Sequence, residues 1–422
     1  MESELRKDLN IITLGNDKNI VYAPLRGVAF YANNKAVDVC KSYIEGCAID
    51  DDSENAPLKE YIKVLEEKIV QEPRCKSITI SNLVVILSQM CNLSCSYCYA
   101  HESRSKDVLN KNQLKAAIDY IMALELKQKH FSFIGGGEPT LTWELLKWSI
   151  RYIRTYPIVE QKNIGIGITT NGTLLDDEKI DFFKENNVFV GLSFEILPDI
   201  QSTQRCFANS NRKTFEVIDE AIKKLVDNNV RISFRSTITK LNVMRMPEMV
   251  IFVSKQYPFM KKLHFEHVTS TNNDKAYYDD FIHYFIEARK IGQSLGIEVY
   301  CSVSHALETL KSRFCKGEFC LTPTGEFVSC HRISSKEEKA FELFKYAQIK
   351  DGFVSINMCK KECLENFYNS KREECAFCFA KWHCAGSCAM ERTFYSEEMR
   401  DLKCYFTKEL IKELLIERLN SA

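Results

Sequence analysis

Three cysteines with a short, fixed spacing carry the strongest chemical signal in the sequence. Cys91, Cys95 and Cys98 form a CxxxCxxC motif directly after the apolar, β-branched run 83–87. This run predicts a buried strand, so the thiols fall in the loop at its carboxyl end. Thiolates are soft ligands that hold iron–sulfur clusters, and a [4Fe–4S] cluster normally takes four of them. Three ligands in one loop leave one iron for another molecule, whereas zinc, the alternative, usually takes four protein ligands.

The elements that must position these cysteines alternate between strand and helix. Predicted strands cover residues 83–87, 131–134, 164–169, 188–194, 231–237 and 263–267. Predicted amphipathic helices cover residues 111–125, 141–155, 177–186, 214–228, 245–257 and 277–294. Six βα units predict an α/β fold, a partial parallel barrel of TIM type, with functional groups at the carboxyl ends of the strands.

Polar groups follow the second, third and fourth of these strands. Gly135, Gly136 and Gly137 come first, and glycines let a ligand approach the backbone, while Glu138 offers a carboxylate to an ammonium group. The next strand ends add hydroxyl, amide and carboxyl groups from Thr169, Asn171, Ser193 and Glu195. Two cations come later, Arg205 in a polar loop and Arg235 on the fifth strand, and for both a structural salt bridge is the alternative interpretation.

Together these motifs resemble the signature of the radical S-adenosylmethionine (SAM) enzymes, in which an aromatic residue, here Tyr97, precedes the last cysteine. In that family the open iron binds the amino and carboxylate groups of SAM, and an electron from the cluster cleaves SAM to a radical that abstracts hydrogen. The resemblance implies that the glycine-rich turn and Glu138 bind the amino group. It also implies that further residues contact SAM: Tyr97, Thr169, Asn171, Ser193, Glu195 and Arg205. Many relatives have aspartate and glycine where this chain has Glu195 and Ile196.

The last third of the chain contains seven further cysteines whose spacing is similar to the SPASM extension of radical SAM enzymes. That resemblance implies two auxiliary [4Fe–4S] clusters. The ligands would be Cys315, Cys330 and Cys388 for the nearer cluster, and Cys375, Cys378, Cys384 and Cys404 for the farther one. The fourth ligand of the nearer cluster stays open between Cys301, Cys320 and a substrate thiolate, although Cys320 lies within a predicted strand, where packing is the simpler role. Cys359 and Cys363 form a CxxxC pair without an assignment.

The 422 residues predict two or three domains. We expect a winged-helix-like module over 1–75, the partial barrel over 76–297 and a SPASM domain over 298–422. In the first region, strands at 19–22 and 28–31 precede helices at 35–45 and 58–70, with an acidic loop at 50–55. Peptide-modifying relatives use such a module to bind a leader by strand addition; a simple cap on the barrel is the alternative. The scattered thiols of Cys40, Cys47 and Cys75 are expected to be buried.

The composition argues against a nucleic-acid-binding or membrane protein and in favour of a protein that binds a metal or a cluster. The 57 basic and 57 acidic residues cancel, so no net field attracts nucleic acid or an anionic membrane. No apolar run reaches the length of a bilayer span, and the charged start is unlike a signal sequence. Eighteen cysteines without an export signal indicate cluster or metal ligands in a reducing cytoplasm.

The barrel motifs and the segments 325–332 and 375–388 resemble SPASM maturases of ribosomally made peptides, especially those that form thioether crosslinks. The resemblance implies a precursor peptide with a leader as substrate, and a flavodoxin- or ferredoxin-type electron donor. Sulfatase-maturing relatives carry an aspartate that serves as a base where this chain has His331, which argues against formylglycine formation. Alternatives are carbon–carbon crosslinking, epimerisation with Cys206 or Cys301 as hydrogen donor, a cluster-bearing redox protein, and a zinc-binding interaction protein.

Overall fold

The computed structural model describes residues 4–47, 56–74, 77–78, 80–101, 104–157 and 163–421. The predicted acidic loop at 50–55 and Cys75 lie outside these residues. The chain forms two compact units. Unit 1 comprises Met1–Lys76, Ser302–Cys315 and Tyr368–Ala422, and unit 2 comprises Ser77–Cys301 and Lys316–Phe367. The division into three domains stays a prediction, because the contacts group the amino-terminal module with carboxyl-terminal segments.

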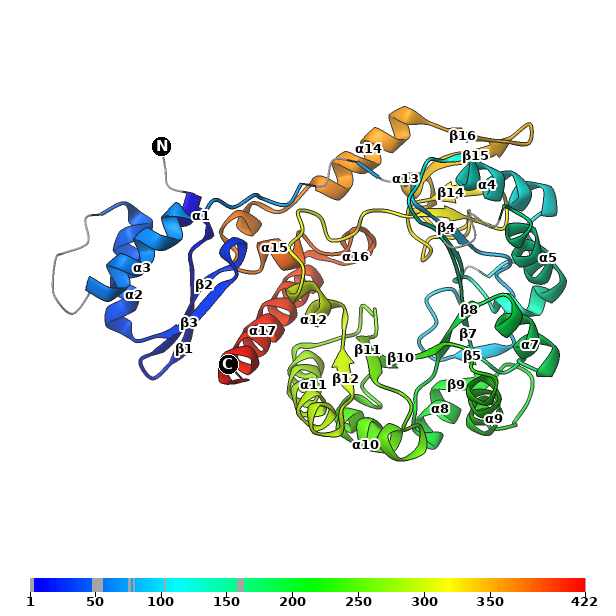
Figure 1. Cartoon of the computed structure of the whole chain (residues 1–422), viewed down its shortest axis with the longest axis horizontal. Coiled ribbons are helices and arrows are strands. Elements are labelled where there is room, and N and C mark those ends of the chain that lie inside the picture. Colours follow the sequence, from blue (N-terminus) through cyan, green and yellow to red (C-terminus); the bar gives the residue numbers. More distant parts are fainter. Residues whose placement is uncertain are drawn as a thin grey trace. The chain divides into compact units, whose positions relative to one another are not determined.

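Unit 2 is built on one long sheet (Figure 1). Seven parallel strands follow each other in chain order across the sheet: β4 (Asn82–Val85), β6 (Lys129–Phe133), β7 (Ile164–Thr170), β8 (Val188–Ser193), β10 (Ile232–Ile238), β11 (Lys262–His267) and β12 (Glu298–Tyr300). On the other side of β4 the strand β13 (Phe319–Leu321) pairs in parallel. The sheet continues in antiparallel fashion with β14 (Glu326–Val328), β15 (Lys345–Lys350) and β16 (Phe353–Ile356). Its parallel part is the predicted α/β fold.

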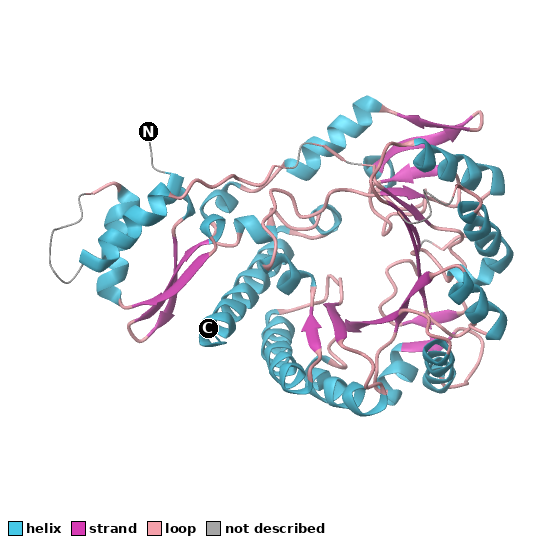
Figure 2. Cartoon of the chain, in the orientation of Figure 1, coloured by secondary structure: helices cyan, strands magenta, loops and turns pink. Residues whose placement is uncertain are grey.

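Helices cover the outer face of the parallel strands (Figure 2). They are α4 (Lys111–Ala123), α5 (Trp143–Arg154), α7 (Asp177–Glu185), α9 (Thr214–Asp227), α10 (Met246–Gln256) and α11 (Lys275–Leu295). Strand β7 illustrates the cause, because its isoleucines and glycines alternate and only the isoleucine face is buried. On α9, Ile218, Ile222 and Leu225 recur at helical spacing and are buried. Apolar residues therefore fill the layer between helices and sheet, and polar residues are left for the inner face.

The six predicted strands and six predicted helices are present, with ends shifted by at most two residues. The prediction omitted β12 and α8 (Pro198–Gln204), and it omitted the small antiparallel pair β5 (Leu93–Cys95) and β9 (Arg205–Phe207). Three-residue strands are too short to show a periodic pattern. A further short helix of unit 2 is α13 (Phe341–Phe344), and α14 (Met358–Asn369) spans the point of the chain where unit 2 ends.

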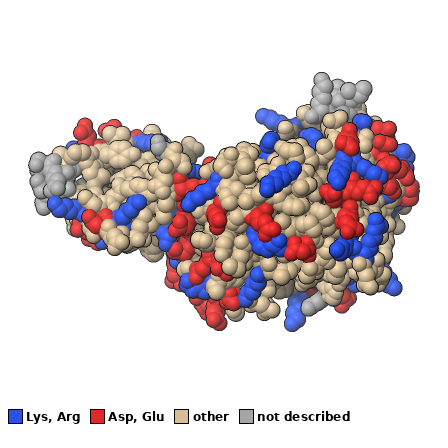
Figure 3. Space-filling view, turned by 90° about the horizontal axis from the view of Figure 1, so that it is seen from below, with Lys and Arg blue, Asp and Glu red and all other residues tan. Residues whose placement is uncertain are grey.

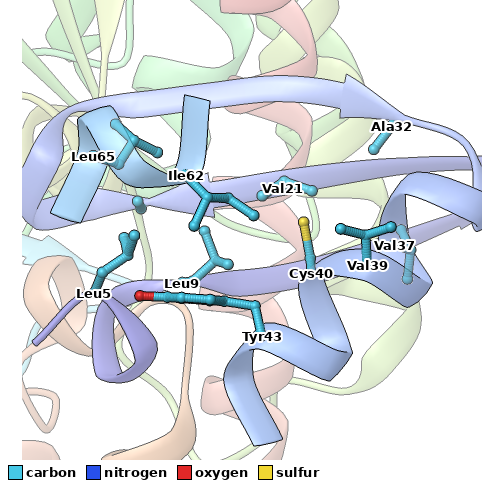
Figure 4. Close-up of a cluster of buried hydrophobic side chains, with 11 residues drawn as sticks. Leu5, Leu9, Val21, Ala32, Val37, Val39, Cys40, Tyr43, Ile62 and Leu65 are labelled. Carbon is cyan, nitrogen blue, oxygen red and sulfur yellow. The ribbon is translucent and has the colours of Figure 1, made fainter. Parts of the chain in front are cut away.

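The amino-terminal part of unit 1 is a three-stranded antiparallel sheet with helices on it. Its strands are β1 (Asn10–Gly15), β2 (Lys18–Ala23) and β3 (Val28–Ala32), and its helices are α1 (Glu4–Asp8), α2 (Asn34–Glu45) and α3 (Ala56–Glu67). Figure 4 shows the shared core, in which Leu5, Val21, Cys40 and Ile62 meet. Strand β1 and helix α1 are additions to the predicted elements. Cys40 is buried as expected, but the prediction for Cys47 is wrong, because it follows the glycine that ends α2 and is exposed.

The carboxyl-terminal part of unit 1 is helical. It contains α12 (Ser302–Leu307), α15 (Lys381–Cys384), α16 (Ala389–Phe394) and α17 (Glu397–Ser421). Helix α17 packs against β3, where Tyr31 donates a hydrogen bond to Asn420 over 2.9 Å. Among the described residues, no helix combines the length and the apolar character that crossing a bilayer requires. Figure 3 shows basic and acidic side chains mixed over the face in view, as expected from a net charge of zero.

Candidate cluster and cofactor site

The cysteine loop lies after β4 and is held by backbone pairing. Strand β5 pairs with β9, so that Cys95 lies opposite Arg205. The N–H of Ser96 donates to the carbonyl of Gln204 over 2.9 Å, and the N–H of Cys98 donates to the carbonyl of Cys95 over 3.2 Å. The loop is therefore held against β9 by a short strand pair that the sequence did not reveal.

The glycine-rich turn after β6 packs directly onto the chain that leads into this loop. The N–H of Gly137 donates to Ser88 over 3.1 Å, and the N–H of Glu138 donates to Met90 over 2.8 Å. A Cβ atom at Gly137 would lie 1.9 Å from the carbonyl oxygen of Met90. Only glycine fits here, because the obstacle is backbone rather than a movable side chain.

Glu138 joins this turn to the turn after β7. Its side chain is buried and accepts hydrogen bonds from Thr140, from the Thr170 hydroxyl over 2.6 Å and from the Asn171 N–H over 2.7 Å. The Asn171 amide in turn donates to the Asn92 side chain over 2.9 Å, within the cysteine loop. Glu138 and Asn171 therefore connect three strand ends, and their contact with a ligand stays a prediction.

Tyr97, Glu195 and Arg205 form a buried polar cluster beside the loop. The Tyr97 hydroxyl donates to Glu195 and accepts from Arg205 over 2.7 Å, while Arg205 lies 3.8 Å from the Glu195 carboxylate. The other Glu195 oxygen accepts from the N–H of Thr237 over 2.9 Å. Burial raises the pKa of Glu195 to about 7, although Arg205 and Tyr97 act in the opposite direction. The side chains of these three residues, which were predicted to contact SAM, are thus bonded to one another.

The three thiols lie close enough to influence one another. Burial raises the pKa of Cys95 to about 11, Arg205 opposes this rise, and negative charge on Cys91 or Cys98 adds to it. Burial also raises the pKa of Cys91, opposed by the Leu93 N–H and by Arg104. Among the described residues, no three His, Cys, Asp or Glu side chains form a group suited to a single metal ion.

Residues 85–252 match the family model described as the radical SAM superfamily. The chain carries a radical SAM domain. Two relatives are a cysteine-type anaerobic sulfatase-maturating enzyme of Clostridium novyi, 29% identical over 194 residues, and the radical SAM cyclopropyl synthase TigE of Paramaledivibacter caminithermalis, 21% identical over 368 residues. The matches cover 44% and 80% of this chain. The chain spans about half the length of the former relative (49%) and 74% of the latter.

The fold is shared with a solved structure, native anSMEcpe with bound AdoMet and the Kp18Cys peptide. The TM-score is 0.67 at 19% sequence identity, over 82% of this chain and 100% of that chain. The radical SAM family implies a [4Fe–4S] cluster and SAM.

The residues present fit such a cluster. The thiols of Cys91, Cys95 and Cys98 are all partly exposed. Two buried guanidinium nitrogens beside them, Nε of Arg104 and of Arg205, have no hydrogen-bond partner in the described part of the chain. Cationic donors around three thiols suit an anionic group that is larger than one metal ion.

Four cysteines of unit 1 influence one another electrostatically, and their role as ligands of a second cluster stays a prediction. Negative charge on Cys375 raises the pKa of Cys378 and of Cys404, and charge on Cys378 and Cys404 raises the pKa of Cys384, after burial as the main cause in each case. All four thiols are therefore within mutual electrostatic reach, as a four-thiolate cluster requires. The set predicted for the nearer cluster, Cys315, Cys330 and Cys388, draws on both units and stays a prediction.

The segment after Cys330 lies beside the cysteine loop within unit 2. The His331 ring contacts Tyr99 edge-on, and its Nδ1 lies 2.8 Å from Glu318. His331 thus has a carboxylate partner, which fits an orienting role as well as a basic one.

The cysteines without an assigned cluster differ in exposure: Cys301 and Cys320 are buried, whereas Cys206, Cys359 and Cys363 are exposed. Cys320 is buried on β13, as expected for a packing residue, and Cys301 is buried after β12. Cys206 is exposed and lies opposite Ser94. Cys359 and Cys363 are exposed on α14.

The inner face of the sheet carries a row of polar side chains that continues from Ser193. The strand register aligns Ser193 with Arg235, Arg235 with His264, and His264 with Tyr300. His264 stacks on Tyr300 and lies 2.9 Å from the Glu266 carboxylate. Arg235 was named from the sequence, whereas Tyr300 was missed because β12 was not predicted, and His264 was missed although its strand was predicted.

Arg104 was missed too, since it stands in a polar loop outside any motif.

Proposed function

We propose that this chain is a radical SAM maturase that cleaves SAM reductively and oxidatively modifies a ribosomally made precursor peptide, forming a thioether crosslink at cysteine. The observation that carries the proposal is the meeting of the cysteine loop, the glycine-rich turn and the turn after β7 at one edge of the parallel sheet. Ligands of α/β folds bind at this edge.

The chain supplies the binding groups. Cys91, Cys95 and Cys98 would hold the cluster, which when bound supplies the electron that cleaves SAM into a hydrogen-abstracting fragment. Glu138 keeps the glycine-rich turn against the loop, and Ser193 and Thr169 offer hydroxyls at neighbouring strand ends. Glu195 is buried and bonded to Tyr97, so in the proposed site it acts by supporting Tyr97.

A peptide substrate is supported by two observations. The solved structure with the same fold contains a bound peptide. In the amino-terminal sheet, order β1-β2-β3 leaves β1 and β3 each with one strand neighbour among the described residues. A leader peptide could extend such an edge by backbone hydrogen bonds. The farther cysteine set, which fits a cluster, would receive the electron that oxidative modification releases.

The first test is cleavage of SAM. Protein reconstituted anaerobically with iron and sulfide, then reduced, is expected to form 5′-deoxyadenosine, and the variant with Cys91, Cys95 and Cys98 replaced by alanine is expected to form none. Cys206→Ala is the matched control, because this exposed thiol lies on the strand that pairs with the loop. Equal product from the triple variant and its parent would refute the proposed site.

The second test is the modification itself. Co-expression with a candidate precursor should lower the peptide mass by two hydrogens and remove one thiol from reaction with iodoacetamide. A loss of two hydrogens with the thiol intact indicates a carbon–carbon crosslink instead, and an unchanged mass with an altered residue configuration indicates epimerisation. Failure to cleave SAM by a fully loaded protein would favour the alternative of a cluster-bearing redox protein. In the proposed scheme the electron donor is a flavodoxin or ferredoxin in a reducing cytoplasm.

A further inference from the structure

Arg104 bridges two points of the cysteine motif, the backbone of Leu93 and the side chain of Cys98. One terminal guanidinium nitrogen donates to the carbonyl oxygen of Leu93 over 3.1 Å, and the other donates to the sulfur of Cys98 over 3.1 Å. Leu93 begins β5 and Cys98 is the last cysteine of the motif. A single side chain therefore spans the loop with both prongs of its planar fork.

The charge of Arg104 also reaches a second thiol. It lowers the pKa of Cys91, against the larger effect of burial. Within the described residues no carboxylate pairs with Arg104, so its positive charge is directed at the thiols and one carbonyl. The simple alternative of a structural salt bridge has no acidic partner there.

A cationic donor at a ligand sulfur has a known physical effect. Hydrogen bonds and positive charge at the sulfurs stabilise the more negative, reduced form of an iron–sulfur cluster and raise its reduction potential. The same contacts restrict the loop, which keeps the three thiols in one arrangement. We propose that Arg104 is a positioning residue that raises the reduction potential of the cluster held by Cys91, Cys95 and Cys98. This inference rests on the proposed cluster at that loop.

Three substitutions separate charge from geometry. Arg104→Lys keeps the charge but cannot make the two-pronged contact, Arg104→Gln keeps a donor without the charge, and Arg104→Met keeps neither. Arg212→Met is the matched control, because it removes the same charge from an exposed side chain of the same unit.

The measurement is a redox titration followed by electron paramagnetic resonance. The signal to follow is the part that changes when SAM is added, which distinguishes the open cluster from any auxiliary cluster. At the potential where the parent is half reduced, Arg104→Met should show a reduced-to-oxidised ratio about tenfold lower, which corresponds to a midpoint about 59 mV more negative. Arg104→Gln should shift in the same direction, and Arg104→Lys should stay near the parent but release iron to a chelator faster. Equal midpoints for Arg104→Met, Arg212→Met and the parent would overturn the proposal.

A second readout applies if Arg104→Met does not hold iron. The comparison is then between the other two variants: Arg104→Gln should show a more negative midpoint than Arg104→Lys, because only lysine keeps the positive charge beside the sulfur. Equal midpoints for these two variants would overturn the proposal.

Failure of the cluster assignment is recognised separately, since the parent and the triple cysteine variant would then contain equal amounts of iron.

Discussion

The contact between Gly137 and Met90 makes a sharp prediction. In Gly137→Ala the new Cβ would lie 1.9 Å from the Met90 carbonyl oxygen and 2.6 Å from the carbonyl carbon of Gln89. Both obstacles are backbone, so the chain entering the cysteine loop must move by about 1.5 Å to reach an ordinary contact. Overpacking of this kind costs about 1–3 kcal/mol of folding free energy. A misplacement of that size near the chemistry lowers the rate by about 100-fold.

The assay compares stability and turnover in the same preparations. Urea denaturation of the iron-free chain should show the loss in unfolding free energy, and anaerobic SAM cleavage should show the loss in rate. Gly167→Ala is the matched control, since a Cβ atom there meets nothing closer than 3.7 Å. If Gly137→Ala cleaves SAM as fast as the Gly167→Ala variant, the glycine-rich turn does not position the cysteine loop and the reasoning fails.

Three further predictions use pKa shifts and the cysteine sets. The pKa of Glu195 is raised from 4.5 to about 7, so the stability that this group contributes is present below pH 4.5 and is lost as pH rises to 7. Relative to Glu195→Gln, the unfolding free energy of the parent should therefore fall by roughly 3 kcal/mol over that window. Parallel pH profiles of the two proteins in urea denaturation would contradict this. Alkylation of Cys95 in the iron-free chain should accelerate about tenfold per pH unit from pH 7 to 10, because its pKa is about 11; mass spectrometry measures the rate, and a plateau below pH 9 would contradict it. Cys384→Ala should lower the bound iron by about four atoms per chain, and Cys359→Ala should leave it unchanged, as measured by iron analysis. Equal losses of iron in both variants would refute the assignment of the four cysteines to the farther cluster.

The sequence predicted the parallel strands well because their signal is strong. Strand β4 begins a continuous apolar run, β7 alternates isoleucine with glycine, and helices such as α9 carry buried residues at helical spacing. The cysteine loop and the glycine-rich turn were located for the same reason, since they stand at the ends of these runs. Local pattern is therefore sufficient to place the edge where ligands bind.

The sequence could not show which polar groups satisfy each other. Tyr97, Glu195 and Arg205 were each expected to contact SAM, but they are bonded to one another through the pairing of β5 with β9. That pairing joins three-residue strands about 110 positions apart, and neither strand has a periodic signal. Arg104 was missed because a single cation in a polar loop resembles any solvated residue until its contacts are known.

Unit 1 has a consequence for how the protein is made. Its amino-terminal sheet is connected to the farther cysteine set by a buried hydrogen bond of 2.5 Å between the Tyr22 hydroxyl and His383, next to Cys384, although some 360 residues separate them. Domains usually fold in order of synthesis. Here the first 70 residues leave the ribosome long before their packing partners exist, and the intervening barrel must emerge first. The four thiols proposed to hold the farther cluster, Cys375, Cys378, Cys384 and Cys404, are therefore available together only once nearly the whole chain has been made. A nascent chain stalled before Tyr368 would expose an incomplete apolar surface to chaperones.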